Sequence, residues 1–183
     1  MRCFVAFDLP ARVRNHLANV VAPLRDRYEI RWVPPEQMHL TMLFGGELDR
    51  AGVDALCGEV EAFDGPAPSL SLDRLGAYPP RGLPRVVWAG LAGDLDVLRG
   101  LHAALEATGA EHGVAREKRG FSPHITLGRV KSNFGVLALL DQLEERSGEL
   151  KDKPFAPGAL TVYESRLTPR GPQHEVLLRR PLR

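Results

Sequence analysis

The feature that most constrains the fold is a short pattern, His-x-Thr, that occurs twice at matching places in the sequence. The two copies are His39-Leu40-Thr41 and His124-Ile125-Thr126. An apolar run precedes each copy at nearly the same distance, 32 positions from Phe7 to His39 and 33 positions from Leu91 to His124. The match predicts an internal duplication, in which each half runs strand, helix, His-x-Thr strand, helix, strand.

The spacing of apolar residues supports this order. Short apolar or alternating runs predict strands, whereas apolar steps of three and four predict helices. Strands are expected at 3–7, 38–44, 70–75, 86–89, 123–130, 160–163 and 175–179, and helices at 13–28, 53–60, 95–105 and 134–143. We therefore expect an α+β fold with two antiparallel sheets flanked by helices and related by a pseudo-two-fold axis. The length suits a single domain of residues 1–183, with lobes at approximately 1–75 and 86–183 and the active site in the cleft between them.

The two motif strands should each present one polar face and one apolar face, because alternate side chains of a strand share a face. His39 and Thr41 then lie together, about 7 Å apart along the strand, and His124 and Thr126 repeat the arrangement. The opposite faces are expected to pack in the core; strict alternation assigns to them Met38, Leu40, Met42 and Phe44 in the first strand, and Ile125, Leu127 and Arg129 in the second.

A symmetric pair of imidazole and hydroxyl groups suits attack on phosphorus. One neutral histidine can accept a proton from water while the other, protonated, donates a proton to the departing oxygen. The ordinary pKa of histidine, ~6.5, makes it apt for both roles, and the Thr41 and Thr126 hydroxyls can donate hydrogen bonds to phosphate oxygens. This chemistry needs no metal or other cofactor, and the chain has no His-Glu-x-x-His motif. His16 and His102, which lie on predicted helices, are expected to be structural.

Composition indicates the class of protein and the compartment in which this chemistry would take place. The chain has 44% hydrophobic and 26% charged residues with a net charge of +1, which is typical of a globular protein without the basic field of a duplex-coating one. Residues 112–131 are locally basic and indicate a small anion-attracting rim around the second motif. No apolar run approaches the ~18 residues of a membrane span. The two cysteines, Cys3 and Cys57, predict a reducing cytoplasm rather than a disulfide framework or a Cys-rich metal site.

Several further segments make the chain resemble a known group of enzymes. They are the opening Arg2-Cys3-Phe4-Val5-Ala6-Phe7-Asp8-Leu9-Pro10, Arg31-Trp32-Val33-Pro34-Pro35 before the first motif, Phe121-Ser122-Pro123 before the second with Leu127-Gly128-Arg129 after it, and Tyr163-Glu164-Ser165-Arg166-Leu167 with Gly171-Pro172. With the two motifs, they resemble the 2H phosphoesterases, and more narrowly the RNA 2′,3′-cyclic phosphodiesterases, also called the 2′-5′ RNA ligase family. Relatives often place Tyr soon after the late Gly-Pro, whereas this chain has Gln173-His174.

The resemblance implies a bilobal α+β fold and hydrolysis of 2′,3′-cyclic phosphate ends to 2′-phosphates, with possible reversible 2′-5′ ligation of RNA. It implies that His124 accepts the proton of water and that His39 donates a proton to the 3′ oxygen. The partners would be RNA ends or nucleotides with a 2′,3′-cyclic phosphate, and we expect a monomer. Arg119, Arg129 and Phe121 are candidate substrate contacts, although strict alternation means that Arg129 reaches the site only through a bulge or at the strand's end.

Three alternatives stay open on the sequence alone. The same fold could act on another small cyclic phosphate or on a 2′-5′ oligonucleotide, which assays with ADP-ribose cyclic phosphate and 2′-5′ oligoadenylate would separate. A second alternative is an RNA- or nucleotide-binding module without turnover, although a pure binder has no need of two proton-transfer groups. A third is a metallohydrolase, which full activity in EDTA would exclude.

Overall fold

The computed structural model describes all 183 residues and confirms the expected alternation of strands and helices. The first half contains β1 (Arg2–Asp8), α1 (Ala11–Val21), β2 (Ile30–Trp32), β3 (His39–Glu47), α2 (Arg50–Ala62) and β4 (Leu70–Tyr78). The second half contains β5 (Val86–Gly93), α3 (Leu95–Glu111), β6 (His124–Val130), α4 (Val136–Ser147), β7 (Ala159–Thr168) and β8 (Gly171–Pro181). Helix α1 ends at Val21 rather than at residue 28, since Pro23 has no N–H group to continue the helix.

All strand pairs are antiparallel, and the strands follow the order β4–β5–β6–β3–β1–β7–β8, with β2 paired to β6. The order β3–β1–β7 on one side of the β3–β6 junction repeats as β6–β5–β4 on the other. Each half of the chain therefore ends in the other half's sheet: β4 of the first half pairs with β5, and β7 of the second half pairs with β1 and is followed at the sheet edge by β8. The duplication expected from the sequence is present in the topology, but the sheets do not coincide with residues 1–75 and 86–183.

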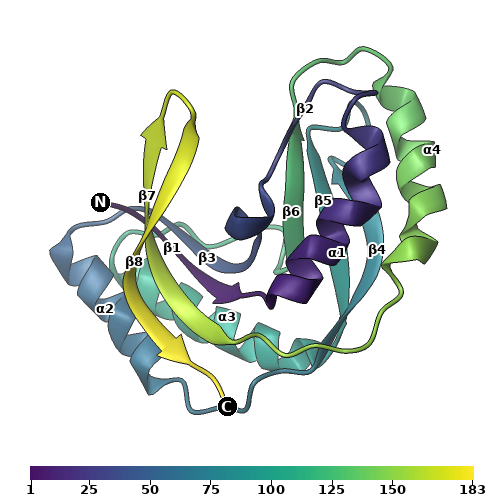
Figure 1. The fold of residues 1–183 in the computed structure, drawn as a ribbon. Helices are drawn as coiled ribbons and strands as arrows, with labels where there is room; N and C mark the ends of the chain where they lie inside the picture. The colour runs from purple at the N-terminus through teal and green to yellow at the C-terminus, as the bar shows by residue number, and fades with distance from the viewer.

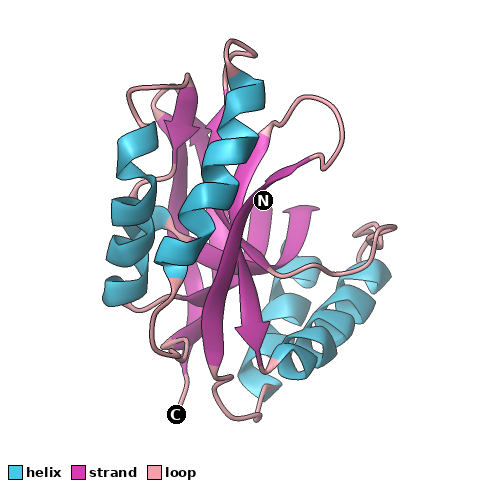
Figure 2. Cartoon of the chain, turned by 90° about the vertical axis from the view of Figure 1, so that its right-hand side faces the viewer, coloured by secondary structure: helices cyan, strands magenta, loops and turns pink.

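The helices are exchanged in the same way. Helices α1 and α4 lie together beside β4, β5 and β6, whereas α2 and α3 lie together beneath the sheet that contains β1, β3 and β7 (Figure 1). Figure 2 shows the two groups of helices with the strands between them. The expected α+β class with helix-flanked antiparallel sheets is thus confirmed. None of the four helices has the combination of length and apolar character needed to cross a membrane.

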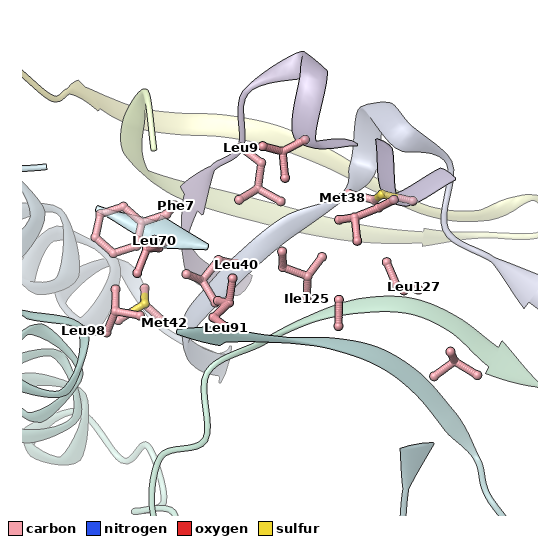
Figure 3. Close-up of a cluster of buried hydrophobic side chains, with 14 of the residues drawn as sticks. Phe7, Leu9, Met38, Leu40, Met42, Leu70, Leu91, Leu98, Ile125 and Leu127 are labelled. Carbon is pink, nitrogen blue, oxygen red and sulfur yellow. The ribbon is translucent and has the colours of Figure 1, made fainter. Parts of the chain in front are cut away.

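The two halves of the sheet meet at a single pair of residues, Leu40 of β3 and Ile125 of β6. Both side chains are fully buried (0% exposed) in a continuous apolar core that also contains Phe7, Met42, Leu98 and Leu127 (Figure 3). The ladders within each half of the sheet are longer; the β7–β8 ladder, for example, runs from Ala159↔Pro181 to Thr168↔Gly171. The central residues of the two His-x-Thr motifs therefore form the junction between the two halves of the protein.

Gly76 of β4 lets a large aromatic side chain lie flat on the sheet. It pairs with Trp88 of β5, and a Cβ atom at this position would overlap the indole ring. Trp88 is 8% exposed and packs against the ring of Tyr78, with a centroid separation of 5.2 Å. The absence of a side chain at Gly76 thus sets the position of two aromatic residues near β6.

We predict that Gly76→Ala lowers the free energy of unfolding by about 1–3 kcal/mol, because the indole of Trp88 has to move out of its packed position. Urea denaturation measures this change. Gly58→Ala is the matched control: Gly58 lies exposed on α2 with open space around it, so alanine should stabilise the protein by about 0.5–1 kcal/mol. Equal stability of Gly76→Ala and the unaltered protein would contradict the packing described here.

Candidate active site

The two His-x-Thr motifs begin β3 and β6 and lie side by side around the Leu40–Ile125 pair. Continuing the antiparallel register by one residue in each direction places His39 opposite Thr126 and Thr41 opposite His124. Leu40 and Ile125 point into the core, so these four polar side chains share the opposite face. All four are partly exposed. The face-by-face prediction from the sequence is confirmed for both motifs.

Each motif histidine is held by the same hydrogen bond. The Nδ1 atom of His39 lies 2.7 Å from the carbonyl oxygen of Gln37, and the Nδ1 atom of His124 lies 2.9 Å from that of Ser122. A carbonyl oxygen can only accept, so Nδ1 carries the proton in both rings. The Nε2 atom is thereby left to accept a proton when the ring is neutral or to donate one when it is charged.

The two histidines differ in their surroundings. His39 stacks on Phe4, with ring centroids 4.9 Å apart, and meets the edge of His174 at 5.7 Å. Burial lowers the pKa of His39 from 6.5 to about 4, and nearby His174 adds to this effect, against the opposing contributions of the Gln37 carbonyl and Asp8. In the free protein, His39 is consequently a neutral imidazole at pH 7.

His124 has a lighter aromatic contact. The ring of Tyr78 meets it edge-on at a centroid distance of 5.5 Å, and the Tyr78 hydroxyl donates to Ser122 Oγ at 3.2 Å. Ser122 also supplies the carbonyl that orients His124. Tyr78 therefore connects the packing at Gly76 and Trp88 to the second motif histidine.

A β-bulge follows the threonine of each motif. In β3, Thr41 pairs with Ala6 and Leu43 with Val5, so Met42 is the extra residue; in β6, Thr126 pairs with Trp88 and Gly128 with Val87, so Leu127 is the extra one. A bulge shifts the alternation of side chains by one position. The two bulges occupy equivalent places in the duplicated halves.

The bulges change the positions of two residues assigned to the core by strict alternation. Phe44 is 66% exposed and lies on the side of His39 and Thr41, so the expectation of a buried Phe44 was wrong. Arg129, the equivalent residue three positions after Thr126, is also exposed rather than buried. The bulge that its candidate role requires is therefore present.

Both bulges are fixed by hydrogen bonds from other parts of the chain. The carbonyl oxygen of Met42 lies 2.7 Å from Nδ1 of His102 on α3, and that of Leu127 accepts from the backbone N–H of Val33 at 2.8 Å. Each bond pairs the carbonyl group of the residue that forms the bulge, as a buried backbone group requires. His102 is thus a structural residue, as expected from its place on a helix.

The described face borders a cavity of about 680 Å³. Among the sequence-predicted residues, it is lined by His39, Thr41, Thr126 and Arg129, joined by the newly exposed Phe44. His124 is only partly exposed and adjoins Thr41 through the strand register, but it does not line this cavity. Arg119 and Phe121 do not line it either: Arg119 is exposed on the preceding loop, and Phe121 stacks on His102 at 4.2 Å.

Sequence reasoning missed the polar cluster behind His39. Asp8, the residue paired with His39 across β1 and β3, accepts hydrogen bonds from the Tyr163 hydroxyl at 2.6 Å, Thr161 Oγ1 at 3.1 Å and Arg179 Nε at 3.2 Å. Burial and the Asp8 carboxylate raise the pKa of the Tyr163 phenol. The only sequence signal was an acid at the end of an apolar strand. The cluster places the Asp8 carboxylate, which is paired with Arg179, beside the strand position of His39.

Two lobes with exchanged strands, meeting at two equivalent His-x-Thr strands, define the class of 2H phosphoesterases. Comparison with known proteins agrees. The sequence profile of LigT-like phosphoesterases matches residues 7–88. A Thermotoga maritima protein named RNA 2′,3′-cyclic phosphodiesterase is 33% identical over 184 residues, covering 97% of this chain and 93% of the relative. A Thermus thermophilus protein of the same name is 32% identical over 191 residues, covering 100% and 91%.

Solved structures give the same result. The crystal structure of Escherichia coli LigT complexed with 3′-AMP superposes with a TM-score of 0.77 at 27% identity, covering 99% of this chain and 97% of LigT. The crystal structure of a Thermus thermophilus protein has the same TM-score and identity, with coverage of 100% and 98%. The chain belongs to the LigT-like phosphoesterase family, whose members are hydrolases.

The burial of His39 has a consequence for stability. Its pKa is about 4 in the folded protein and 6.5 when exposed, so between these values the unfolded chain binds more protons. We predict that stability falls as the pH is lowered from 6.5 towards 4, and that the His39 imidazole proton signals in NMR titrate near pH 4. Urea midpoints should depend less on pH in His39→Asn than in the control His112→Asn. A His39 titration at or above pH 6.5 would refute the assigned burial.

Proposed function

We propose that the protein hydrolyses 2′,3′-cyclic phosphate ends of RNA to 2′-phosphates by two-histidine acid–base catalysis. The observation that carries the proposal is the equivalence of the two motifs: each presents an imidazole whose Nδ1 is fixed on a carbonyl two residues earlier, with a threonine beside it. The names of the relatives from Thermotoga and Thermus supply the substrate class.

In the proposed reaction, water attacks the phosphorus atom opposite the 3′ oxygen, since phosphoryl displacement runs roughly in line. His124 Nε2 accepts the proton of the attacking water. The bond between phosphorus and the 3′ oxygen breaks, and His39 Nε2 donates a proton to that oxygen. The product carries a 2′-phosphate and a free 3′-hydroxyl, and each histidine is left in the protonation state opposite to its starting one.

The two threonines are proposed to stabilise the phosphate. Thr41 and Thr126 lie on the same face as the histidines and line the cavity. Their hydroxyl groups can donate hydrogen bonds to the two non-bridging oxygens, where negative charge accumulates in the transition state. Because each threonine is opposite the histidine of the other motif, a phosphate centred on the pair meets one donor from each strand.

The low pKa of His39 sets a condition on its role as proton donor. In the free protein this ring is neutral at pH 7, which by itself suits a base. An anionic cyclic phosphate bound at Nε2 favours the charged imidazolium and raises the pKa of His39. Asp8, behind the ring, acts in the same direction. The donor is therefore proposed to charge when the substrate binds.

The cavity also suggests how the remainder of the nucleotide is held. Phe44 offers an exposed ring on which a base can stack without strong preference for its identity. Arg129 stays a proposed phosphate contact, whereas Arg119 and Phe121 lie outside the cavity lining and are weaker candidates.

The proposed arrangement of the two histidines could also accept a ribose 5′-hydroxyl in place of the attacking water. Attack by that hydroxyl on the cyclic phosphate would produce the 2′-5′ linkage of the reversible ligation.

We further propose that residues 1–183 act as one unit and as a monomer, because both motifs and both exchanged strands come from a single chain. Separate halves would each lack a strand of their own sheet. Cys3 and Cys57 are both free thiols, which supports a reducing, cytoplasmic setting.

Replacing either motif histidine tests the proposal. Asparagine keeps a donor near the position of Nδ1 and removes Nε2, so His39→Asn and His124→Asn should lower kcat for a 2′,3′-cyclic phosphate by about 10²–10⁴. The double variant should lose less than the product of the single losses, since both groups act on one step. His112→Asn, on a loop outside the cleft, is the control and should retain its activity. Near-full turnover by either single variant in folded form would sink the assignment.

A further inference from the structure

The outer part of the β7–β8 hairpin forms one wall of the cavity and has no third strand beside it. Strand β1 pairs with β7 as far as Cys3↔Glu164, whereas β7 and β8 continue to pair from Ser165↔His174 to Thr168↔Gly171. This two-stranded segment, the distal hairpin (residues 165–174), extends past β1 (Figure 1). Its cavity-lining residues are Ser165, Leu167, Arg170, Gly171, Pro172 and His174. Because a two-stranded hairpin alone is marginally stable in water, its position depends on contacts with the rest of the protein.

The polar and aromatic contacts of the distal hairpin converge on His39. The Nε2 atom of Gln37 donates a hydrogen bond to the carbonyl oxygen of Pro172 at 3.3 Å. It is the only side-chain hydrogen bond between the distal hairpin and the protein outside β7 and β8. The ring of His174 meets the ring of His39 at a centroid distance of 5.7 Å and that of Phe4 at 4.9 Å, both edge-on. This wall of the cavity is therefore attached at the proposed proton donor.

Gln37 takes part in this attachment with both its backbone and its side chain. Its carbonyl oxygen lies 2.7 Å from Nδ1 of His39, while its side-chain amide holds Pro172. Gln37 ends the single turn that begins at Pro35, and the carbonyl of Pro35 accepts from Arg14 of α1 at 3.3 Å. The carbonyl that orients His39 is thus held from α1 on one side and from the distal hairpin on the other.

The second motif has an equivalent connection. Ser122 also stands two residues before its histidine; its carbonyl orients His124, and its Oγ accepts from the Tyr78 hydroxyl at 3.2 Å. Tyr78 ends β4, which comes from the first half of the chain, just as Pro172 lies on β8 from the second half. In both motifs, this residue joins its histidine to a strand of the opposite half. The repetition indicates that the Gln37 link belongs to the duplicated site.

We propose that Gln37 is a positioning residue for the proton donor: its side chain holds the distal hairpin, so that this wall of the cavity and the His39 imidazole keep one fixed relative position. The inference rests on the proposed function and adds a residue to it. A substrate that fills the cavity meets Leu167 and Arg170 of the hairpin, so the same residue aligns the substrate and the donor. Catalysis depends steeply on such alignment, since a displacement of about 1 Å can lower a rate by about 10².

Gln37→Met tests the proposal, because methionine has nearly the same length but cannot donate to Pro172, and the backbone carbonyl stays in place. Loss of one neutral hydrogen bond should lower kcat for a nucleoside 2′,3′-cyclic phosphate by about 3–10-fold. KM should change little, because alignment of the donor acts on the transition state. The Nδ1 proton of His39, followed by NMR, should exchange with solvent faster, since the carbonyl that accepts it is less firmly held. Gln37→Asn, whose amide is one methylene too short to reach Pro172, should behave in the same way.

Gln173→Met is the matched control. Gln173 is exposed beside Pro172 and does not line the cavity, so kcat and the proton exchange should equal those of the unaltered protein. Urea midpoints check that the variants are folded. The proposal is overturned if both Gln37 variants keep full kcat, if only KM changes, or if kcat falls while the exchange of the His39 Nδ1 proton stays the same. If the unaltered protein hydrolyses no cyclic phosphate, the proposed function fails instead, and the exchange rates in Gln37→Met and Gln173→Met test the link by themselves.

Discussion

The contact between Leu40 and Ile125 is the constraint on which the rest of the structure depends. It is the only residue pair joining β3 to β6, and it brings the centres of the two motifs together. Because both side chains point into the core, the flanking histidines and threonines must face away from it. One apolar contact thus determines that four polar groups, two from each half of the chain, surround a single place on the sheet.

The internal symmetry of the fold provides two equivalent histidines, His39 and His124, and local packing gives them different surroundings. The same carbonyl contact orients His39 and His124, and equivalent bulges follow both threonines. Phe4 and His174 enclose His39, whereas His124 meets only the edge of Tyr78 among the aromatic residues. After the bulge in β3 an aromatic ring, Phe44, lines the cavity, whereas after the equivalent bulge in β6 a cation, Arg129, lines it. A duplicated scaffold can in this way hold two imidazole groups in different surroundings, as the proposed acid and base roles require.

The sequence predicted the motif faces, the order of the elements apart from β2 (Ile30–Trp32), and the duplication, because these depend on local periodicity and on core-forming apolar residues. It could not predict the exchange of β4 and β7, which depends on pairing between segments far apart in the chain. It also misplaced Phe44, since a bulge arises from the mismatch between two strands rather than from either sequence alone. The hydrogen bonds of Asp8 could not be predicted either, because its partners come from β7 and β8, which are far from Asp8 in the sequence. For Arg129, the family resemblance indicated a role in binding phosphate, whereas strict alternation placed its side chain in the core. The bulge at Leu127 exposes the side chain, so the fold is compatible with that role.

The central claim is that one histidine stands on each side of a single phosphate, with the 3′ oxygen towards His39. Phosphorus NMR of the product from an oligonucleotide with a 2′,3′-cyclic phosphate end tests it most directly. In-line attack with His39 as the donor predicts a terminal 2′-monophosphate as the dominant product. A dominant 3′-monophosphate would contradict the account, because the ribose would then lie in the opposite orientation with the 2′ oxygen at the proton donor.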